Sequence, residues 1–225
     1  MNFDDKTLKM IQILADSFFP LLKAGLQFTV PLTLISFILG LILALLTALA
    51  RISDFKSLVS LARFYVWVIR GTPLLVQLFI IFYGLPAVGI TINPMISAII
   101  GFTLNAGAYN SEVIRAAILS IPKGQWEAAL SINMTNRQAI RRIILPQAVR
   151  VSVPPLANSF ISLVKDTSLA ATITLTEMFQ VAQRITATTY EPLLLYCETA
   201  FIYLIFCTVL SSIQNNMEKR VGKYV

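Results

Sequence analysis

Two adjacent ionisable side chains, Lys165 and Asp166, interrupt an otherwise apolar stretch of the chain. A lysine can bind a carboxylate and an aspartate can bind an ammonium group, so together they could hold a zwitterion. On a helix, Asn158 and Ser162 share one side with this pair at spacings of three and four residues, and Ser159 follows Asn158. The alternative is an interfacial anchor whose charged groups reach the lipid headgroups.

Asn105 is the second polar candidate, because it lies in a long uncharged stretch beside Ala106, Gly107 and Ala108. Polar groups inside a membrane are costly and usually functional. Small neighbours let helices approach closely, so Asn105 could serve the same site or form a hydrogen bond between helices. The sequence predicts Asn105, Asn158, Ser159, Lys165 and Asp166 as substrate-binding residues.

Several kinds of chemistry lack the residues that they require. The chain contains no histidine, and Cys197 and Cys207 would lie about 15 Å apart along one helix, too far for a disulfide. No Gly-x-x-x-x-Gly-Lys-Ser/Thr sequence occurs, so a phosphate loop for ATP is missing. We therefore expect no catalytic residue, no metal site and no cofactor bound by this chain.

The composition indicates that membrane helices position these residues. Of the 225 residues, 56% are hydrophobic and 13% are charged, against about 25% charged in a soluble domain. Too little charge remains to cover a water-facing surface. The fold class predicted is an all-α polytopic membrane protein, with residues 1–225 forming a single transmembrane domain.

Uncharged stretches set the positions of the spans, since each span needs about 20 mostly apolar residues. Only 14 uncharged residues separate Arg150 from Lys165, about 21 Å of helix. Either this piece does not span, or the fourth span includes Lys165 and Asp166 and is completed by residues 169–175. We favour the second, because an even number of spans would break the charge pattern of the loops. The five predicted spans cover about 24–50, 64–84, 95–113, 150–175 and 193–214.

The N-terminal stretch and the ends of the spans carry weaker signals. Residues 1–23 have apolar residues at helical spacing, which fits a helix on the membrane surface or a frayed terminus. We expect Arg70 to reach the cytoplasmic interface, and Thr72-Pro73 to start or kink a helix. Glu112 and Arg115 are predicted to form an interfacial ion pair.

Loop charges predict the orientation of the chain. With alternate loops assigned to opposite sides, one side holds twelve basic residues and the other holds five. The more basic side is normally cytoplasmic. The N-terminus is thus expected outside and the C-terminus in the cytoplasm, and the net charge of +7 reflects topology rather than a nucleic-acid partner.

The connection at about 122–146 is predicted to be a short cytoplasmic helix, a turn and a second helix. Residues 125–132 favour a helix, and Asn133 can adopt the left-handed backbone that ends it. Thr135 and Gln138 have capping-box spacing, so the second helix should begin at Asn136. We expect an interruption at Leu145-Pro146.

Trp126 gives this connection an apolar side, together with Ala128, Ala129 and Ile132. Exposing that side to water would be costly, whereas a groove on a partner protein would cover it. The alternative is a solvated surface helix without a partner.

The connection resembles the EAA loop of permeases in ATP-binding-cassette (ABC) importers. Glu127-Ala128-Ala129, Ile143 and Leu145-Pro146 match that pattern in identity and spacing, and Asn133 replaces its glycine. The resemblance implies a type I ABC importer permease architecture, with a coupling helix that docks in a cleft of the ATPase. It implies ATPase-coupling roles for Gly124, Trp126, Glu127, Ala128, Ala129 and Asn133.

Four further stretches, 70–77, 104–109, 123–129 and 162–169, resemble the polar amino-acid branch and most nearly its cystine-type permeases. The resemblance implies import of L-cystine, or else of glutamine, glutamate, arginine or histidine. Relatives that carry basic amino acids can have Glu where Ser159 stands, so Ser159 fits a neutral or zwitterionic substrate.

The same resemblance implies a set of partners in the cytoplasmic (inner) membrane. They are a homodimeric ABC ATPase that holds ATP and Mg²⁺, an extracytoplasmic amino-acid-binding protein, and a second permease copy, identical or paralogous. Five spans are few to enclose a pathway, which also favours two copies.

Two other classes of function are weaker alternatives. An ion-coupled secondary carrier should show inverted internal repeats, and the sequence contains none that we recognise. A membrane enzyme or scaffold needs a catalytic constellation that this chain lacks.

Overall fold

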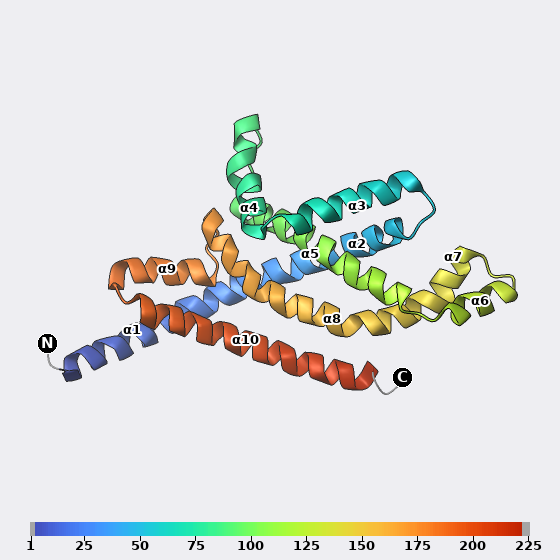
Figure 1. Cartoon of the computed structure of the whole chain (residues 1–225). Helices are drawn as coiled ribbons and strands as arrows, with labels where there is room; N and C mark the ends of the chain where they lie inside the picture. Colours follow the sequence, from blue (N-terminus) through green and yellow to red (C-terminus); the bar gives the residue numbers. More distant parts are fainter. Residues whose placement is uncertain (1–2, 222–225) are drawn as a thin grey trace. The chain divides into compact units, whose positions relative to one another are not determined.

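The computed structural model describes residues 3–221, and every regular element among them is helical (Figure 1). Lys223, one of the basic residues used to predict the orientation, lies outside this range. The α-helices are α1 Phe3–Ala24, α2 Val30–Arg51, α3 Lys56–Gly71, α4 Leu74–Phe79, α5 Pro94–Leu119, α6 Lys123–Ser131, α7 Asn136–Ala139, α8 Leu145–Asp166, α9 Met178–Thr189 and α10 Pro192–Val221.

The N-terminal stretch is a helix that continues into the first predicted span. A π-helical turn, Gly25–Thr29, joins α1 to α2 without a break. Of the two alternatives for residues 1–23, the frayed terminus is therefore wrong for the described part. The charge-free stretch after Lys23 lies in the second half of this long helix.

The second predicted span, 64–84, is interrupted, because the chain breaks between α3 and α4. Thr72 has an extended backbone, with φ −122° and ψ 145°. A proline disfavours helical backbone at the preceding residue, so Pro73 accounts for the break. The hydroxyl of Thr72 donates to the Val68 carbonyl at 2.9 Å, one turn back in α3. The predicted start or kink at Thr72-Pro73 is thus confirmed.

The third and fifth predicted spans correspond to α5 and α10, both longer than expected. The fourth begins as α8, but its regular α-helix ends at Asp166. A 3₁₀-helix, Thr167–Ile173, follows and ends where Thr174 adopts a left-handed backbone with φ 63°. Residues 169–175 therefore do not extend the α-helix.

Two helices in the described part of the chain are long and apolar enough to cross a membrane, Lys6–Arg51 and Pro192–Asn216. A third is counted if the bent pair Lys56–Gly71 and Leu74–Val88 forms one span. The all-helical membrane architecture predicted from composition is confirmed at this level.

The chain divides into two compact units, which are described separately. One contains Phe37–Leu74, Phe102–Phe160 and the start of the C-terminal segment from Ile213. Small side chains let its helices approach closely: a Cβ added to Gly107 would lie 2.7 Å from the Tyr65 hydroxyl. Its core consists of Ala44, Ala48, Ile114, Ala117, Ile118, Ile121, Ile144 and Ala148.

The other unit contains the residues up to Ser36, Leu75–Gly101 and Ile161–Ser212. Here α1, α9 and α10 meet through Leu21, Met178, Ala182 and Ile202, all of them buried. Gly25 provides the space beside them, since a Cβ there would lie 3.0 Å from the Phe206 ring.

Candidate functional site

The short helix α6 begins after Pro122 and ends in a Schellman motif. The Asn133 N–H donates to the Leu130 carbonyl at 2.9 Å, and the Met134 N–H donates to the Ala129 carbonyl at 3.1 Å. Asn133 has φ 59°, in the left-handed region. The predicted helix end at Asn133 is confirmed.

The start of the second helix is confirmed as well. Thr135 Oγ1 accepts from the Gln138 N–H at 3.3 Å, while Gln138 Oε1 accepts from the Thr135 N–H at 2.9 Å. This reciprocal capping box satisfies two N–H groups that the helix itself cannot pair. The predicted interruption at Leu145-Pro146 takes the form of a π-helical turn, Ile140–Ile144, rather than a break. Such turns accommodate local departures from regular helical hydrogen bonding.

Two of the side chains predicted to face a partner lie against the chain's own core. Trp126 packs against the alanine- and isoleucine-rich core of its unit, and Ala129 is buried. Packing against the chain's own core covers part of the Trp126 ring and all of Ala129, which removes apolar area from water. Contact of these two residues with a partner stays a prediction.

The opposite side of α6 remains exposed. Gly124, Glu127, Ala128 and Ser131 are exposed and recur at the spacings that place residues on one helix side. Ile132, just beyond the helix, is 68% exposed. We call this set the outer face of α6. It contains three of the predicted coupling residues.

The residues predicted to bind substrate lie on two helices. Asn105 is half-buried on α5, while Asn158, Ser159, Lys165 and Asp166 lie on α8. Asn158 Oδ1 accepts a hydrogen bond from Gln214 Nε2 at 3.0 Å, which ties α8 to α10 within one unit. Lys165 and Asp166 are exposed and belong to the other unit.

Asn110 on α5 is a candidate that the sequence analysis missed. Its side chain is fully buried, and neither amide atom has a hydrogen-bond partner among the described residues. A buried amide without partners is costly and therefore requires an explanation. Its place five residues after Asn105 in the same uncharged stretch is the only sequence signal for it.

Glu112 is the centre of a charge cluster larger than the predicted ion pair. Arg115, one turn further along α5, donates to it at 3.0 Å, so the predicted pairing of these two residues is confirmed. Arg51 at the end of α2 also donates to Glu112, and Arg70 at the end of α3 lies 3.5 Å from it. The Arg70 guanidinium stands over the Tyr109 ring, 5.1 Å from its centre. One carboxylate on α5 thus binds the ends of α2 and α3.

Glu177 is the most buried carboxylate in the described chain, with 0% exposure, and it caps the N-terminus of α9. It accepts from the N–H groups of Phe179 and Gln180 at 2.9 and 2.7 Å, and from the Tyr203 hydroxyl at 2.9 Å. Burial raises the pKa of Glu177 to about 7, although these three donors oppose the shift. Glu177 is not among the residues predicted from the sequence, because nothing local indicated its burial.

Comparison with known proteins identifies the family. Residues 36–223 match the model of the binding-protein-dependent transport system inner membrane component. The chain belongs to this family. The predicted role as a transport subunit of the inner membrane is thereby confirmed, and an ion-coupled carrier or a membrane enzyme is not supported.

This inner membrane component is similar to named permeases over nearly its whole length. It is 55% identical to the L-cystine transport system permease protein TcyB of Bacillus subtilis, over 95% of this chain and 92% of that protein. It is 41% identical to the probable amino-acid ABC transporter permease protein YckA of the same organism, over 94% of each.

A solved structure, the crystal structure of an amino acid ABC transporter with histidines, superposes on the component with a TM-score of 0.82. It is 32% identical, with 98% of this chain and 99% of that chain covered. The predicted resemblance to polar amino-acid permeases of ABC importers is confirmed.

Proposed function

We propose that this chain is the permease subunit of an ABC importer that brings L-cystine into the cell. The observation that carries the proposal is the 55% identity, over 95% of the chain, to a permease named for L-cystine transport. The alternative is another amino acid, such as glutamine, glutamate, arginine or histidine. The uncharged Ser159 favours a zwitterion of no net charge over a basic substrate.

The proposed topology has five spans in one transmembrane domain, with the N-terminus outside and the C-terminus in the cytoplasm. The spans are the second half of Lys6–Arg51, the broken pair α3 and α4, then α5, α8 and α10. The excess of basic residues on alternate loops supports this orientation. It places α6 in the cytoplasm.

The outer face of α6 is proposed to dock on a separate ATPase, which would hold ATP and Mg²⁺. Gly124, Glu127 and Ala128 would touch the partner, and Glu127 would form its polar contact. Trp126 and Ala129 hold α6 to the core of its own unit, and Asn133 sets the turn that follows. Movement of the ATPase would thus reach the spans through α6.

Substrate recognition is proposed for Asn105, Asn158, Ser159, Lys165 and Asp166. Both side chains are exposed within this chain, so both can contact a solute. Lys165 would bind the carboxylate of the amino acid and Asp166 its ammonium group, because each pair has opposite charges. A second permease copy would complete the pathway around a shared axis, and an extracytoplasmic binding protein would deliver the amino acid.

Reconstitution tests the proposal. The chain would be placed in liposomes with its ATPase and binding protein, and uptake of labelled cystine would be followed with and without ATP. We expect uptake that needs ATP and all three proteins, and that unlabelled cystine suppresses better than arginine or glutamine. Stronger suppression by arginine would reject cystine. Uptake driven by an ion gradient without the ATPase would reject the importer itself.

A further inference from the structure

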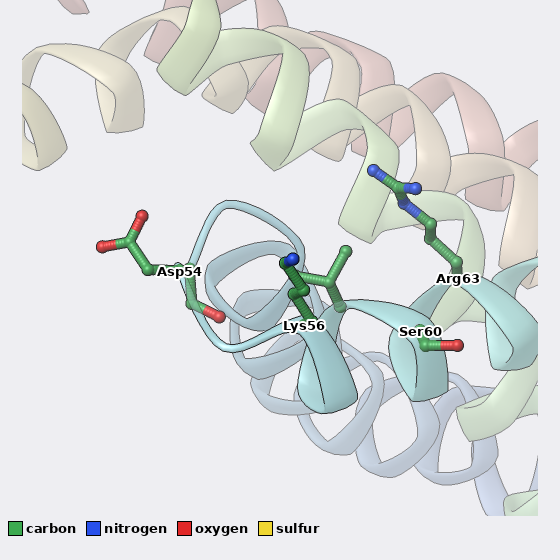
Figure 2. Close-up of a pocket in the computed structure, with 6 residues that line it drawn as sticks. Asp54, Lys56, Ser60 and Arg63 are labelled. Carbon is green, nitrogen blue, oxygen red and sulfur yellow. The ribbon is translucent and has the colours of Figure 1, made fainter.

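A hollow of about 300 Å³ opens where the connection between α2 and α3 meets the first turns of α3 (Figure 2). It lies entirely within one of the two units. The transport proposal above uses none of its residues. Its lining consists of Ser53, Asp54, Lys56, Val59, Ser60 and Arg63.

The charges of this hollow suit an anion. Lys56, Ser60 and Arg63 recur at spacings of four and three residues, which places them on one side of α3. Neither Lys56 nor Arg63 forms an ion pair with a described residue. The ion pairs among the described residues all involve Glu112, with other arginines. The Asp54 carboxylate points away from Lys56 and Arg63 (Figure 2). Two cations without an ion-pair partner among the described residues therefore line this hollow, while the Ser60 hydroxyl points away from both of them (Figure 2).

The surface beside the hollow is apolar, which a soluble anion would not need. Phe55 is 72% exposed and Trp67 is 71% exposed, and Leu58, Leu61 and Phe64 are exposed between them. Trp67 follows Ser60 and Arg63 on their side of α3, about 6 Å beyond Arg63 along the helix. Tryptophan is typical of the membrane–water interface. Cations at one end and apolar side chains beyond them complement a phospholipid with an anionic headgroup.

We propose that this hollow binds the headgroup of an anionic phospholipid. Lys56 and Arg63 hold the phosphate from two sides, and Ser60 contributes only to the wall of the hollow. The acyl chains run along Phe64 and Trp67. This inference goes beyond the proposed function, because it depends on neither the solute nor the ATPase.

Fluorescence of Trp67 tests the inference in the intact chain. Trp126 is the one other tryptophan, so Trp126→Phe leaves Trp67 as the reporter. The protein is placed in phosphatidylcholine vesicles that contain phosphatidylglycerol, with bromine on the acyl chains of one lipid or the other. We expect brominated phosphatidylglycerol to quench Trp67 more strongly than brominated phosphatidylcholine at equal mole fraction.

The variant Lys56→Gln/Arg63→Gln should reduce this preference on the order of tenfold, because each basic side chain near a surface adds to anionic lipid binding. The matched control is Arg137→Gln/Arg141→Gln, which removes the same charge from another basic hollow, lined by Arg137, Gln138, Arg141 and Arg142. The control should keep the preference. Native mass spectrometry, on proteins that keep Trp126, would measure how much phosphatidylglycerol stays bound to each. The wild type and the control should retain more of this lipid than Lys56→Gln/Arg63→Gln.

Four outcomes would overturn the proposal. Equal quenching by both brominated lipids would remove the headgroup preference, and an unchanged preference in Lys56→Gln/Arg63→Gln would remove the residues. Displacement of the lipid by inorganic phosphate at equal concentration would assign the hollow to a soluble anion. Protection of Trp67 from both lipids, with crosslinking at Leu61 between two copies, would assign this side of α3 to a second copy of the chain.

Discussion

The hydroxyl of Tyr203 lies 2.9 Å from a carboxylate oxygen of Glu177, and this hydrogen bond joins α10 to the start of α9. The same carboxylate caps α9 through two backbone N–H groups. The Glu177 side chain therefore has a structural role whichever protonation state it adopts. Which state it prefers depends on pH.

The stability of this unit should fall as pH rises from about 4.5 to about 7. Burial raises the pKa of Glu177 from 4.5 to about 7, so the folded chain holds the proton more tightly than the unfolded chain. The stabilisation that comes from this bound proton is complete below about pH 4.5 and is lost as pH rises to about 7. Over this range the free energy of unfolding falls by at most about 1.4 kcal/mol per pH unit. Thermal unfolding in detergent should show this slope, and Glu177→Gln should flatten it. An equal slope in both proteins would contradict the assignment.

Removal of the Glu112 charge should destabilise the helix ends that it joins. Glu112→Gln leaves Arg51, Arg70 and Arg115 close together without the carboxylate that pairs them. We expect a loss of about 2 kcal/mol in the free energy of unfolding, since these groups are partly buried. Asp16→Asn, at an exposed acid on α1, is the matched control and should change little. A loss that is no larger for Glu112→Gln than for the control would show that the cluster is not stabilising.

Gly107 should not tolerate a side chain. In Gly107→Ala the new Cβ would lie 2.7 Å from the Tyr65 hydroxyl and 2.8 Å from Leu43 Cδ2. The Tyr65 hydroxyl donates to the Leu104 carbonyl at 2.6 Å, so moving it also costs a hydrogen bond. We expect a loss of about 1–3 kcal/mol in stability. Gly71→Ala is the control, because nothing lies within 4 Å of the position where its Cβ would be; similar melting temperatures for the two variants would refute the steric argument.

Glu127→Lys should abolish ATP-driven uptake without affecting membrane insertion. Glu127 is exposed on the outer face of α6, so a reversed charge there disturbs a partner rather than the core. Gln125→Lys introduces a positive charge nearer the buried side of the same helix and should retain uptake. Transport assays and protease protection separate coupling from insertion. Full uptake by Glu127→Lys would remove this residue from the proposed mechanism.

Asn133→Gly should stabilise the turn after α6, whereas Asn133→Ala should destabilise it. The backbone of Asn133 has φ 59°, where glycine has no steric penalty. Asn tolerates this region better than Ala because its short polar side chain can form local hydrogen bonds, so Ala loses about 1 kcal/mol. Thermal unfolding of the two variants should therefore move in opposite directions relative to the wild type. Equal shifts would mean that backbone strain at this turn is unimportant.

Features set by neighbouring residues were predictable from the sequence. The capping box at Thr135 and Gln138, the left-handed Asn133 and the break at Pro73 each depend on the chemistry of a few adjacent residues. The apolar stretch of α10 needed only its length and its single acid, Glu198.

Features that join distant segments could not be predicted in the same way. Glu112 was paired correctly with Arg115 three residues away, but Arg51 is 61 residues away. Glu177 meets Tyr203 only after α9 and α10 have folded together. The apolar ring of Trp126 could be covered by a partner protein or by the chain's own core. The periodicity of α6 does not distinguish these two arrangements. Tertiary packing decided each case.

The inward position of Trp126 has a mechanical consequence. Its ring contacts the cluster that contains Ala44 on α2 and Ile118 on α5, so no flexible linker separates α6 from these helices. Close-packed interiors have low compressibility and transmit strain. A load on the outer face of α6 is therefore carried into α2 and α5 with little slack, as by a rigid lever.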